Sequence, residues 1–441
     1  MNADKFVPQH SHFDFAQCKS LSTQHSALST QHSVLSTPNS ALSTQHSVLS
    51  TPNSALSTQH SALFTFRPYQ RKFARPLTTH HGVWEMREGI ILRLVDEAGN
   101  VGWGEIAPIS WFASETLEQA LDFCRQLPKE ITSETIFAIP DDLPACQFGF
   151  ESAFEGMESR EWGVGENMSC TWISHKREIQ GSRKGGRMVK KSFPPHSPLS
   201  PLSPHSPHSP HSPHSPLSPH PLPIREKFGC SGLLAAGEVA LQQWQKLWEE
   251  GYRTFKWKIG VDAIATELAI FDNLCRSLPA SAKLRLDANG GLSYEAANLW
   301  LETCDKIQGE VSAEIEFLEQ PLPVNDLAGM LELSKFNRTA IALDESVATL
   351  QQLISCYQQG WRGIFVLKPG IIGSPSKLRQ FCQQHEIDAV FSSVFETVIG
   401  RQAALNLAAE LSRKNRAVGF GVDHFFAQAA ATNPENLWNN L

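Results

Sequence analysis

The stretch Thr254-Phe255-Lys256-Trp257-Lys258-Ile259-Gly260 contains two lysines that a β-strand would place on one face. Its alternating pattern predicts such a strand, and the two ammonium groups should lie about 7 Å apart. Two neighbouring ammonium groups repel each other, which lowers the cost of neutralising one of them. A neutral lysine is a usable general base. The alternative interpretation is a pair of lysines on a solvated strand face.

Downstream of this stretch, short apolar segments alternate with helical segments to about residue 415, which is typical of a parallel α/β architecture. Ser392-Ser393 and Gly419-Phe420-Gly421 fall late in this series. Polar residues end five successive strand candidates at intervals of 24 to 32 residues: Lys258, Asp287, Glu319, Asp344 and Lys368. A closed barrel of strand–helix units brings the carboxyl ends of its strands to one mouth. We therefore expect these side chains to meet.

The predicted meeting point would hold three carboxylates between two lysines. Carboxylates from adjacent strands suit an octahedral Mg²⁺ that keeps positions open for substrate oxygens, and Mn²⁺ is the alternative divalent ion. The two lysines would flank the bound substrate. Each acidic strand end taken alone has a simpler explanation, as the start of a loop or the cap of the next helix. Five polar strand ends in phase favour a shared site.

The segments TFKWKIG, LRLDANGG, EFLEQPL, ALDES and VLKPGIIGS between residues 254 and 374 resemble motifs of the enolase superfamily, muconate-lactonizing subgroup. Within that subgroup they are most similar to the o-succinylbenzoate synthases. The resemblance covers about residues 64–155 and 224–441. It implies a (β/α)7β modified TIM barrel under an α+β capping domain.

The resemblance also implies a role for each matching residue. Asp287, Glu319 and Asp344 would bind Mg²⁺, Lys258 would be the base, and Lys368 would be the cation that faces it across the substrate. The chain has six further candidates for substrate binding or for close neighbours of the site: Lys256, Asn289, Ser392, Ser393, His80 and His81. The alternative for the two serines is that they simply finish a strand, and for the two histidines that they are solvated.

Members of this family are carbon–oxygen lyases. They dehydrate 2-succinyl-6-hydroxy-2,4-cyclohexadiene-1-carboxylate to o-succinylbenzoate, on the route to menaquinone or phylloquinone. N-succinylamino acid racemases and other lysine-base racemases or cycloisomerases of the superfamily remain an alternative. Dipeptide epimerases typically carry Asp-x-Asp at the last barrel strand, where this chain has Gly419-Phe420-Gly421-Val422-Asp423. A non-catalytic scaffold is the second alternative.

The first half of the chain contains a smaller module, residues 64–155. Arg87–Val95 and Val101–Glu105 predict a hairpin around a turn at residues 96–100, and Ser114-Glu115-Thr116 predicts the start of a helix. The resemblance makes this module a capping domain whose loops at residues 78–82 and 105–111 fold over the mouth of a barrel formed by residues 224–420. Residues 421–441 should return to the capping domain.

Two low-complexity segments flank this module. In residues 1–63 leucine recurs every seven residues, but no second apolar position matches a coiled coil, and Pro38 and Pro52 would break a helix. Residues 156–223 combine a basic run with His-Ser-Pro repeats, in which proline favours an extended, solvated chain. We predict disorder in both segments.

The composition narrows the class of protein further. Lysine and arginine total 38 against 45 aspartates and glutamates, a net charge of −7, which is not typical of a nucleic-acid or membrane binder. The nine cysteines are scattered without a CxxC pair, which indicates reduced thiols. No apolar stretch reaches about 18 residues. We expect a cytoplasmic enzyme, monomeric or homo-oligomeric, that acts on a small-molecule carboxylate.

Overall fold

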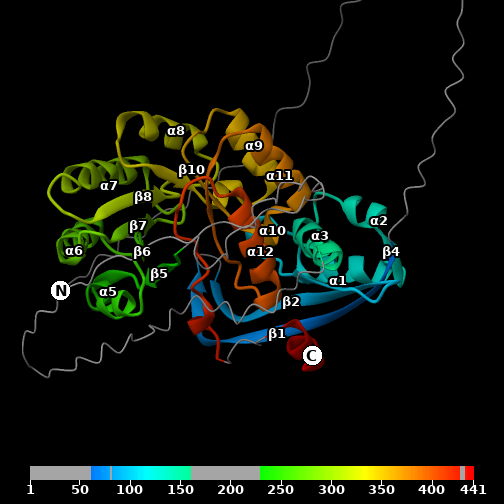
Figure 1. Ribbon diagram of the computed structural model, residues 1–441. Coiled ribbons are helices and arrows are strands. Elements are labelled where there is room, and N and C mark those ends of the chain that lie inside the picture. Colours follow the sequence, from blue (N-terminus) through cyan, green and yellow to red (C-terminus); the bar gives the residue numbers. More distant parts are fainter. Residues whose placement is uncertain (1–60, 80–81, 160–228, 428–432) are drawn as a thin grey trace, which may run out of the picture. The chain divides into compact units, whose positions relative to one another are not determined.

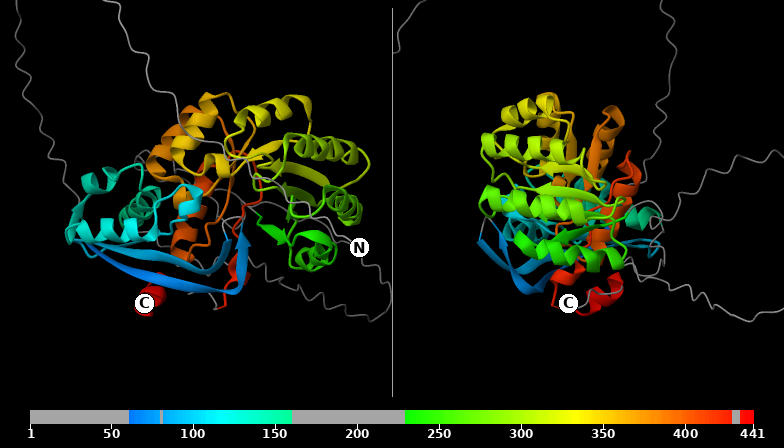
Figure 2. Two further views of the ribbon diagram at one scale, coloured as in Figure 1. Left: turned by 180° about the vertical axis from the view of Figure 1, so that it is seen from behind. Right: turned by 90° about the vertical axis from the view of Figure 1, so that its left-hand side faces the viewer.

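The computed structural model describes residues 61–79, 82–159, 229–427 and 433–441. All of them belong to one compact unit, and their strands form two sheets, one antiparallel and one parallel (Figure 1). The two long strands of the antiparallel sheet and the helices that surround the parallel sheet can be followed from two more directions in Figure 2. Among the described residues, no helix is both long and apolar enough to span a bilayer.

The antiparallel sheet has the strand order β3-β2-β1-β4. Its strands are β1 (Ser61–Thr79), β2 (Gly82–Asp96), β3 (Val101–Ile106) and β4 (Glu130–Thr132). The hairpin predicted from residues 87–105 is confirmed, because β2 pairs with β3 in antiparallel register from Ile90 opposite Ile106 to Val95 opposite Val101.

Short helices cover this sheet: η1 (Ser110–Phe112), α1 (Leu117–Gln126), α2 (Ser133–Phe137) and α3 (Pro144–Ser159). The predicted start of a helix after residue 116 is confirmed, since Thr116 and Gln119 form a reciprocal capping box at the start of α1. Helix α3 lies directly on β3. Gly102 and Gly104 permit this approach, because a Cβ at either position would overlap carbonyl oxygens of α3.

The parallel sheet follows chain order from β5 to β11. Its strands are β5 (Ser231–Leu234), β6 (Thr254–Lys258), β7 (Lys283–Asp287), β8 (Glu314–Glu319), β9 (Ile341–Leu343), β10 (Ile364–Leu367) and β11 (Asp388–Phe391). Val418 bridges in parallel to Cys230 beside β5, and Gly419 bridges in parallel to Ser392 beyond β11. Residues 418–419 therefore stand in for an eighth strand and close the sheet.

Helices follow the barrel strands and lie outside them (Figure 1). They are η2 (Gly237–Val239), α5 (Ala240–Glu249), α6 (Ile264–Ser277), α7 (Tyr294–Ile307), α8 (Leu327–Phe336), η3 (Glu345–Val347), α9 (Leu350–Gln358), α10 (Pro369–Ile372), α11 (Pro375–Gln384) and α12 (Val398–Leu411). Seven strand–helix units and a closing strand confirm the predicted (β/α)7β barrel beside an α+β module.

Two elements of the structure extend beyond the predicted segment boundaries. Strand β1 begins at Ser61, inside the predicted repeat segment, and α3 continues to Ser159, past the expected start of the insertion. The rest of both low-complexity segments lies outside the described residues. After the barrel come η4 (Asp423–Phe425) and α13 (Pro434–Asn439), and the Trp438 ring packs against Trp103 of β3.

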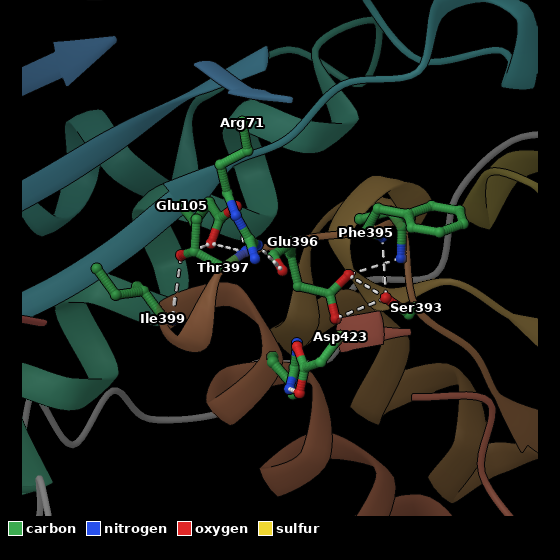
Figure 3. A network of polar contacts seen from close by, with 10 residues as sticks. Arg71, Glu105, Ser393, Phe395, Glu396, Thr397, Ile399 and Asp423 are labelled. Atoms are coloured by element: carbon green, nitrogen blue, oxygen red, sulfur yellow. Dashed lines mark hydrogen bonds and ion pairs between the residues drawn. The ribbon is translucent and has the colours of Figure 1, made fainter. Parts of the chain in front are cut away.

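Glu105 of β3 joins the antiparallel sheet to the barrel (Figure 3). Its buried carboxylate accepts hydrogen bonds from the backbone N–H groups of Thr397 and Gly400, at 2.9 Å each, and from the Thr397 hydroxyl. These donors form the first turn of α12, where a negative charge is favoured by the free N–H groups and the helix dipole. The hydroxyl of Tyr69 on β1 donates to the same carboxylate at 2.5 Å.

We predict that Glu105→Gln lowers the free energy of unfolding by about 3 kcal/mol, because an amide leaves buried donors of α12 without an acceptor and removes the charge. The shift can be measured as a lower urea midpoint. Glu97→Gln, at an exposed position in the β2–β3 turn, is the matched control and should change stability by less than about 0.5 kcal/mol. Equal midpoints for both variants would contradict this role of Glu105.

Candidate active site

The backbone register of three adjacent strands sets the candidate site. Lys258 at the end of β6 lies opposite Asp287 at the end of β7, which in turn lies opposite Glu319 at the end of β8. The backbone pairing continues past these strand ends, since Ile259 donates to the Asp287 carbonyl and Ala288 to the Glu319 carbonyl. Parallel strands are about 4.8 Å apart, so the three side chains start as direct neighbours.

Lys256 lies one step deeper on the same face of β6 as Lys258. Its ammonium contacts Asp287 Oδ2 and Glu319 Oε1 at 2.8 Å each. Burial alone would lower the pKa of Lys256, but the nearby carboxylates of Asp287, Glu319 and Asp344 more than offset this and hold the pKa well above its usual value. Lys256 is therefore a fixed positive charge. Lys256 is therefore not the lysine of the pair that would be neutralised.

Asp344 and Lys368 complete the set from the next two strands. The Lys368 ammonium contacts Asp344 Oδ1, and both side chains are buried. Gln320 holds Asp344 in place, because its Oε1 accepts from the backbone N–H groups of Asp344 at 3.0 Å and Ser346 at 3.2 Å. Gln320 itself has a φ of 38°, an uncommon backbone conformation for a residue other than glycine.

The carboxylates affect one another's protonation. Burial lowers the tendency of Glu319 to ionise, and the charges of Asp287 and Asp344 add to this, so its pKa lies well above the usual value despite Lys256. Burial opposes the ionisation of Asp287 too, but Lys256 and Lys258 bring its pKa below the usual value. Glu345, beside Asp344, has its pKa raised to about 7 by burial and by the same two aspartates. The site contains more acidic groups than its lysines neutralise.

Asn289 connects the outer lysine to this acidic group. Lys258 donates to Asn289 Oδ1 at 2.6 Å, and Asn289 Nδ2 donates to Glu345 Oε1 at 3.1 Å. The Asn289 backbone has a φ of 45°, and its N–H donates to Asp287 Oδ1 at 3.1 Å. Lys258 itself is exposed, so its ammonium lies at the open side of the site.

The donor set fits a hard divalent cation by its chemistry. Asp287, Glu319 and Asp344 are oxygen ligands with exposed fractions of 8%, 1% and 4%, and two of them already share one cation, the Lys256 ammonium. Across residues 61–79, 82–159, 229–427 and 433–441, however, no three His, Cys, Asp or Glu side chains are grouped closely enough to hold a metal. The carboxylates point to lysines, so gathering them around an ion requires side-chain rotation.

The remaining predicted residues are placed unevenly. Ser393 lies after β11, and its hydroxyl donates to the Glu396 carboxylate at about 3 Å while accepting from the Phe395 N–H, so it is used within its own loop (Figure 3). Ser392 makes the backbone bridge to Gly419. His80 and His81 lie outside the described residues.

Sequence reasoning missed three residues that contact the predicted site residues. Gln320 and Glu345 stand next to two predicted ligands in the quoted motifs, but strand-end spacing gives no role to the residue that follows a ligand. Phe112 of η1 places its ring 4.2 Å from the Lys368 ammonium, measured to the ring centroid. The two residues lie 256 positions apart in the chain, so no local pattern could have paired them.

We predict that Lys256→Met lowers the free energy of unfolding by about 3–5 kcal/mol near neutral pH in metal-free buffer, because it leaves buried carboxylates without their cation. Asp287, whose pKa is lowered in the folded state, contributes stability above the usual aspartate pKa of about 4 and loses it as the pH falls through the folded value. The difference between variant and wild type should therefore hold down to about pH 4 and narrow as the pH falls below it.

Urea unfolding at several pH values measures this difference. Lys283→Met is the matched control, since Lys283 on β7 pairs with Glu314 where both side chains are 40% exposed or more, and it should cost at most about 1 kcal/mol. A constant, pH-independent loss in Lys256→Met would show that packing, not charge, explains the effect.

Comparison with known proteins identifies relatives of both parts of the chain. Residues 239–437 match the family Enolase C-terminal domain-like, and residues 64–157 match the family MenC, N-terminal domain. An o-succinylbenzoate synthase of Thermosynechococcus vestitus is 36% identical over 381 residues, which span 85% of this chain and 98% of that protein. An L-Ala-D/L-Glu epimerase of Bacillus subtilis is 31% identical over 170 residues, 38% of this chain and 45% of that protein.

A solved structure extends the similarity to the fold. The crystal structure of o-succinylbenzoate synthase from Thermosynechococcus elongatus, complexed with Mg in the active site, matches with a TM-score of 0.67 and 34% identity, and covers 86% of this chain and 100% of that one. Sequence and structure agree over almost the whole length of the two o-succinylbenzoate synthases. The chain therefore belongs to the o-succinylbenzoate synthase family of the enolase superfamily.

Proposed function

We propose that the protein is an o-succinylbenzoate synthase, a lyase that removes water from 2-succinyl-6-hydroxy-2,4-cyclohexadiene-1-carboxylate in a Mg²⁺-dependent reaction. One observation carries the proposal: in a chain that matches a synthase of this name over 98% of that protein's length, adjacent barrel strands end in Lys258, Asp287 and Glu319 in direct register. The product would serve the biosynthesis of menaquinone or phylloquinone.

Asp287, Glu319 and Asp344 are the proposed Mg²⁺ ligands. The crowding of acidic groups at the strand ends supports this, because burial and neighbouring carboxylates raise the pKa of Glu319 and Glu345, and a divalent cation would favour the ionised carboxylates. When bound, Mg²⁺ would stabilise the negative charge that develops on the substrate carboxylate as the adjacent C–H bond breaks. Mn²⁺ offers the same oxygen-ligand chemistry and is the proposed substitute.

Lys258 and Lys368 are the proposed catalytic lysines. Lys258, as the neutral amine, would take the proton next to the substrate carboxylate, and its ammonium would then give that proton to the departing hydroxyl group. The C–O bond breaks, water leaves, and the ring becomes aromatic. The buried ammonium of Lys368 would hold the negative charge of the enediolate. Lys256, Asn289, Ser392, Ser393, His80 and His81 remain proposed neighbours or contacts of the substrate.

The proposed domain division assigns residues 64–155 and 421–441 to the cap, and residues 224–420 to the barrel.

Racemisation of N-succinylamino acids is the second candidate function, because it requires two lysines on opposite sides of one substrate carbon. The sequence of the last barrel strand argues against dipeptide epimerisation, because it lacks the Asp-x-Asp motif of those enzymes. Asp423, the acidic residue nearest to it, forms an ion pair with Arg401, with Oδ2 and Nη1 2.6 Å apart.

The test is incubation of the full chain with the cyclohexadiene substrate and Mg²⁺, with the absorbance of the aromatic product as the readout. Lys258→Ala should abolish turnover while Mg²⁺ still binds, because the base is removed and the ligands stay. Lys246→Ala, on the exposed face of α5, is the matched control and should keep wild-type rates. Turnover of an N-succinylamino acid without turnover of the cyclohexadiene would favour the racemase instead.

Mg²⁺ binding should release protons, because Glu319 keeps its proton to higher pH than an ordinary glutamate and must lose it to act as a ligand. The apparent affinity should therefore decrease as the pH is lowered. Calorimetric titrations in two buffers of different ionisation enthalpy should give different heats. Glu319→Gln should bind Mg²⁺ weakly and with buffer-independent heat. Buffer-independent heat in the wild type would contradict this assignment.

A further inference from the structure

We propose that Phe112 of the capping module is a positioning residue for Lys368, and that its ring face fixes the ammonium at the place where the substrate's negative charge develops. The inference rests on the function proposed above. It adds a role for an aromatic residue outside the barrel, whereas the proposed metal ligands and catalytic lysines all lie at the ends of barrel strands.

The contact has the geometry of a cation–π interaction. The Lys368 ammonium lies 4.2 Å from the centroid of the Phe112 ring, well within the range of about 6 Å over which such pairs attract. Lys368 is only 9% exposed, so water competes little for its charge. Phe112 is half-buried, and its ring also packs against the apolar core of the capping module. The ring thus has one side on the cap and one face on the lysine.

The loop that carries Phe112 is unusually well fixed. Arg87 of β2 is 2% exposed and donates to the carbonyl oxygens of Ala107 and Pro108, the latter at 2.9 Å. The hydroxyl of Ser114 accepts from the Ile109 N–H at 2.7 Å. Burying a guanidinium group is unfavourable unless acceptors satisfy its N–H groups, and these two carbonyl oxygens are such acceptors. A displaced loop would leave buried donors of Arg87 unpaired.

The residue after Phe112 has a strained backbone conformation, which determines the direction of the chain as it leaves η1. Ala113 has a φ of 60°, in the left-handed region that residues with a Cβ rarely adopt. Beyond it, the carboxylate of Glu115 accepts from the N–H groups of Ala145 and Cys146 at the start of α3, at 3.0 and 2.7 Å. Strained residues that the surroundings hold in place often mark functional positions.

The ring has a distinct task because the other contact of Lys368 is a proposed metal ligand. Asp344 cannot direct all its oxygens to Mg²⁺ and also remain the sole anchor of the ammonium. The Phe112 face attracts the cation without offering a hydrogen-bond acceptor, so it can hold the charge in place while leaving its N–H groups for the substrate. Loss of the ring should therefore reduce the rate of the chemical step more than substrate binding.

The test replaces Phe112 by mono-, di- and trifluorophenylalanine, which weaken the negative ring face stepwise at almost constant shape. We expect kcat to fall with each fluorine, on the order of tenfold in total, with KM unchanged. Phe112→Tyr should retain most activity and Phe112→Leu should lose it. The same fluorinated series at Phe123, whose ring packs edge-on against Phe150 in the cap, is the matched control and should leave kcat unchanged.

Two results would overturn the inference. If the unmodified protein turns over the cyclohexadiene and fluorination of Phe112 leaves kcat unchanged, the ring contributes only to packing. An increase in KM at constant kcat would place the ring against the substrate instead. A wild type without turnover would reject the proposed function itself, which separates the two failures.

A second measurement needs neither metal nor substrate. In protein labelled with ¹³C at the lysine ε-carbon, the signal that is lost in Lys368→Arg should show the upfield shift of a group above an aromatic face. Phe112→Leu should move that signal back toward the position of solvated lysines, while Phe112→Tyr should keep it. An unshifted Lys368 signal in the wild type would contradict the contact.

Discussion

The balance of charge at the ends of β6 to β10 is the constraint on which the site depends. Each of these strands ends in an ionisable side chain or is directly followed by one, and the closed sheet brings these residues to one rim, where all but Lys258 are buried. Burying a carboxylate is unfavourable unless a cation or several hydrogen-bond donors compensate it. Lys256 and Lys368 supply that compensation directly, and the raised pKa of Glu319 shows that it is incomplete.

The same balance explains why the surrounding backbone is so specific. Asn289 and Gln320 both follow a proposed ligand directly or at one remove, both have positive φ values, and both direct a side-chain amide to a charged neighbour or its backbone. Amide groups can donate and accept at once without adding charge. They therefore fix the directions of lysine and carboxylate side chains while leaving the net charge available to a cation and a substrate.

The sequence predicted the alternation of strands and helices and the polar strand ends because both depend on local pattern, and the family resemblance implied the (β/α)7β barrel. A strand of five residues alternates visibly, and a parallel sheet in chain order makes phase along the sequence equivalent to position around the rim. The contacts of Phe112 with Lys368 and of Glu105 with α12 depend instead on how two modules dock, across 256 and 292 residues. No spacing rule connects such pairs. A sequence pattern also cannot predict whether a carboxylate at the rim points toward a lysine or toward an ion.

The docking of the two modules also has a consequence for the chemistry. Glu105 fixes the start of α12, directly after the loop that contains Ser393 and Phe395, and Phe395 packs edge-on against Phe73 and Trp84 of the cap. Phe112 reaches Lys368 from the same module. The cap therefore contacts the loops after β10 and β11, whereas the carboxylates lie on β7 to β9. A change in the cap would therefore first affect the loops after β10 and β11, and it would leave the acidic side of the rim in place.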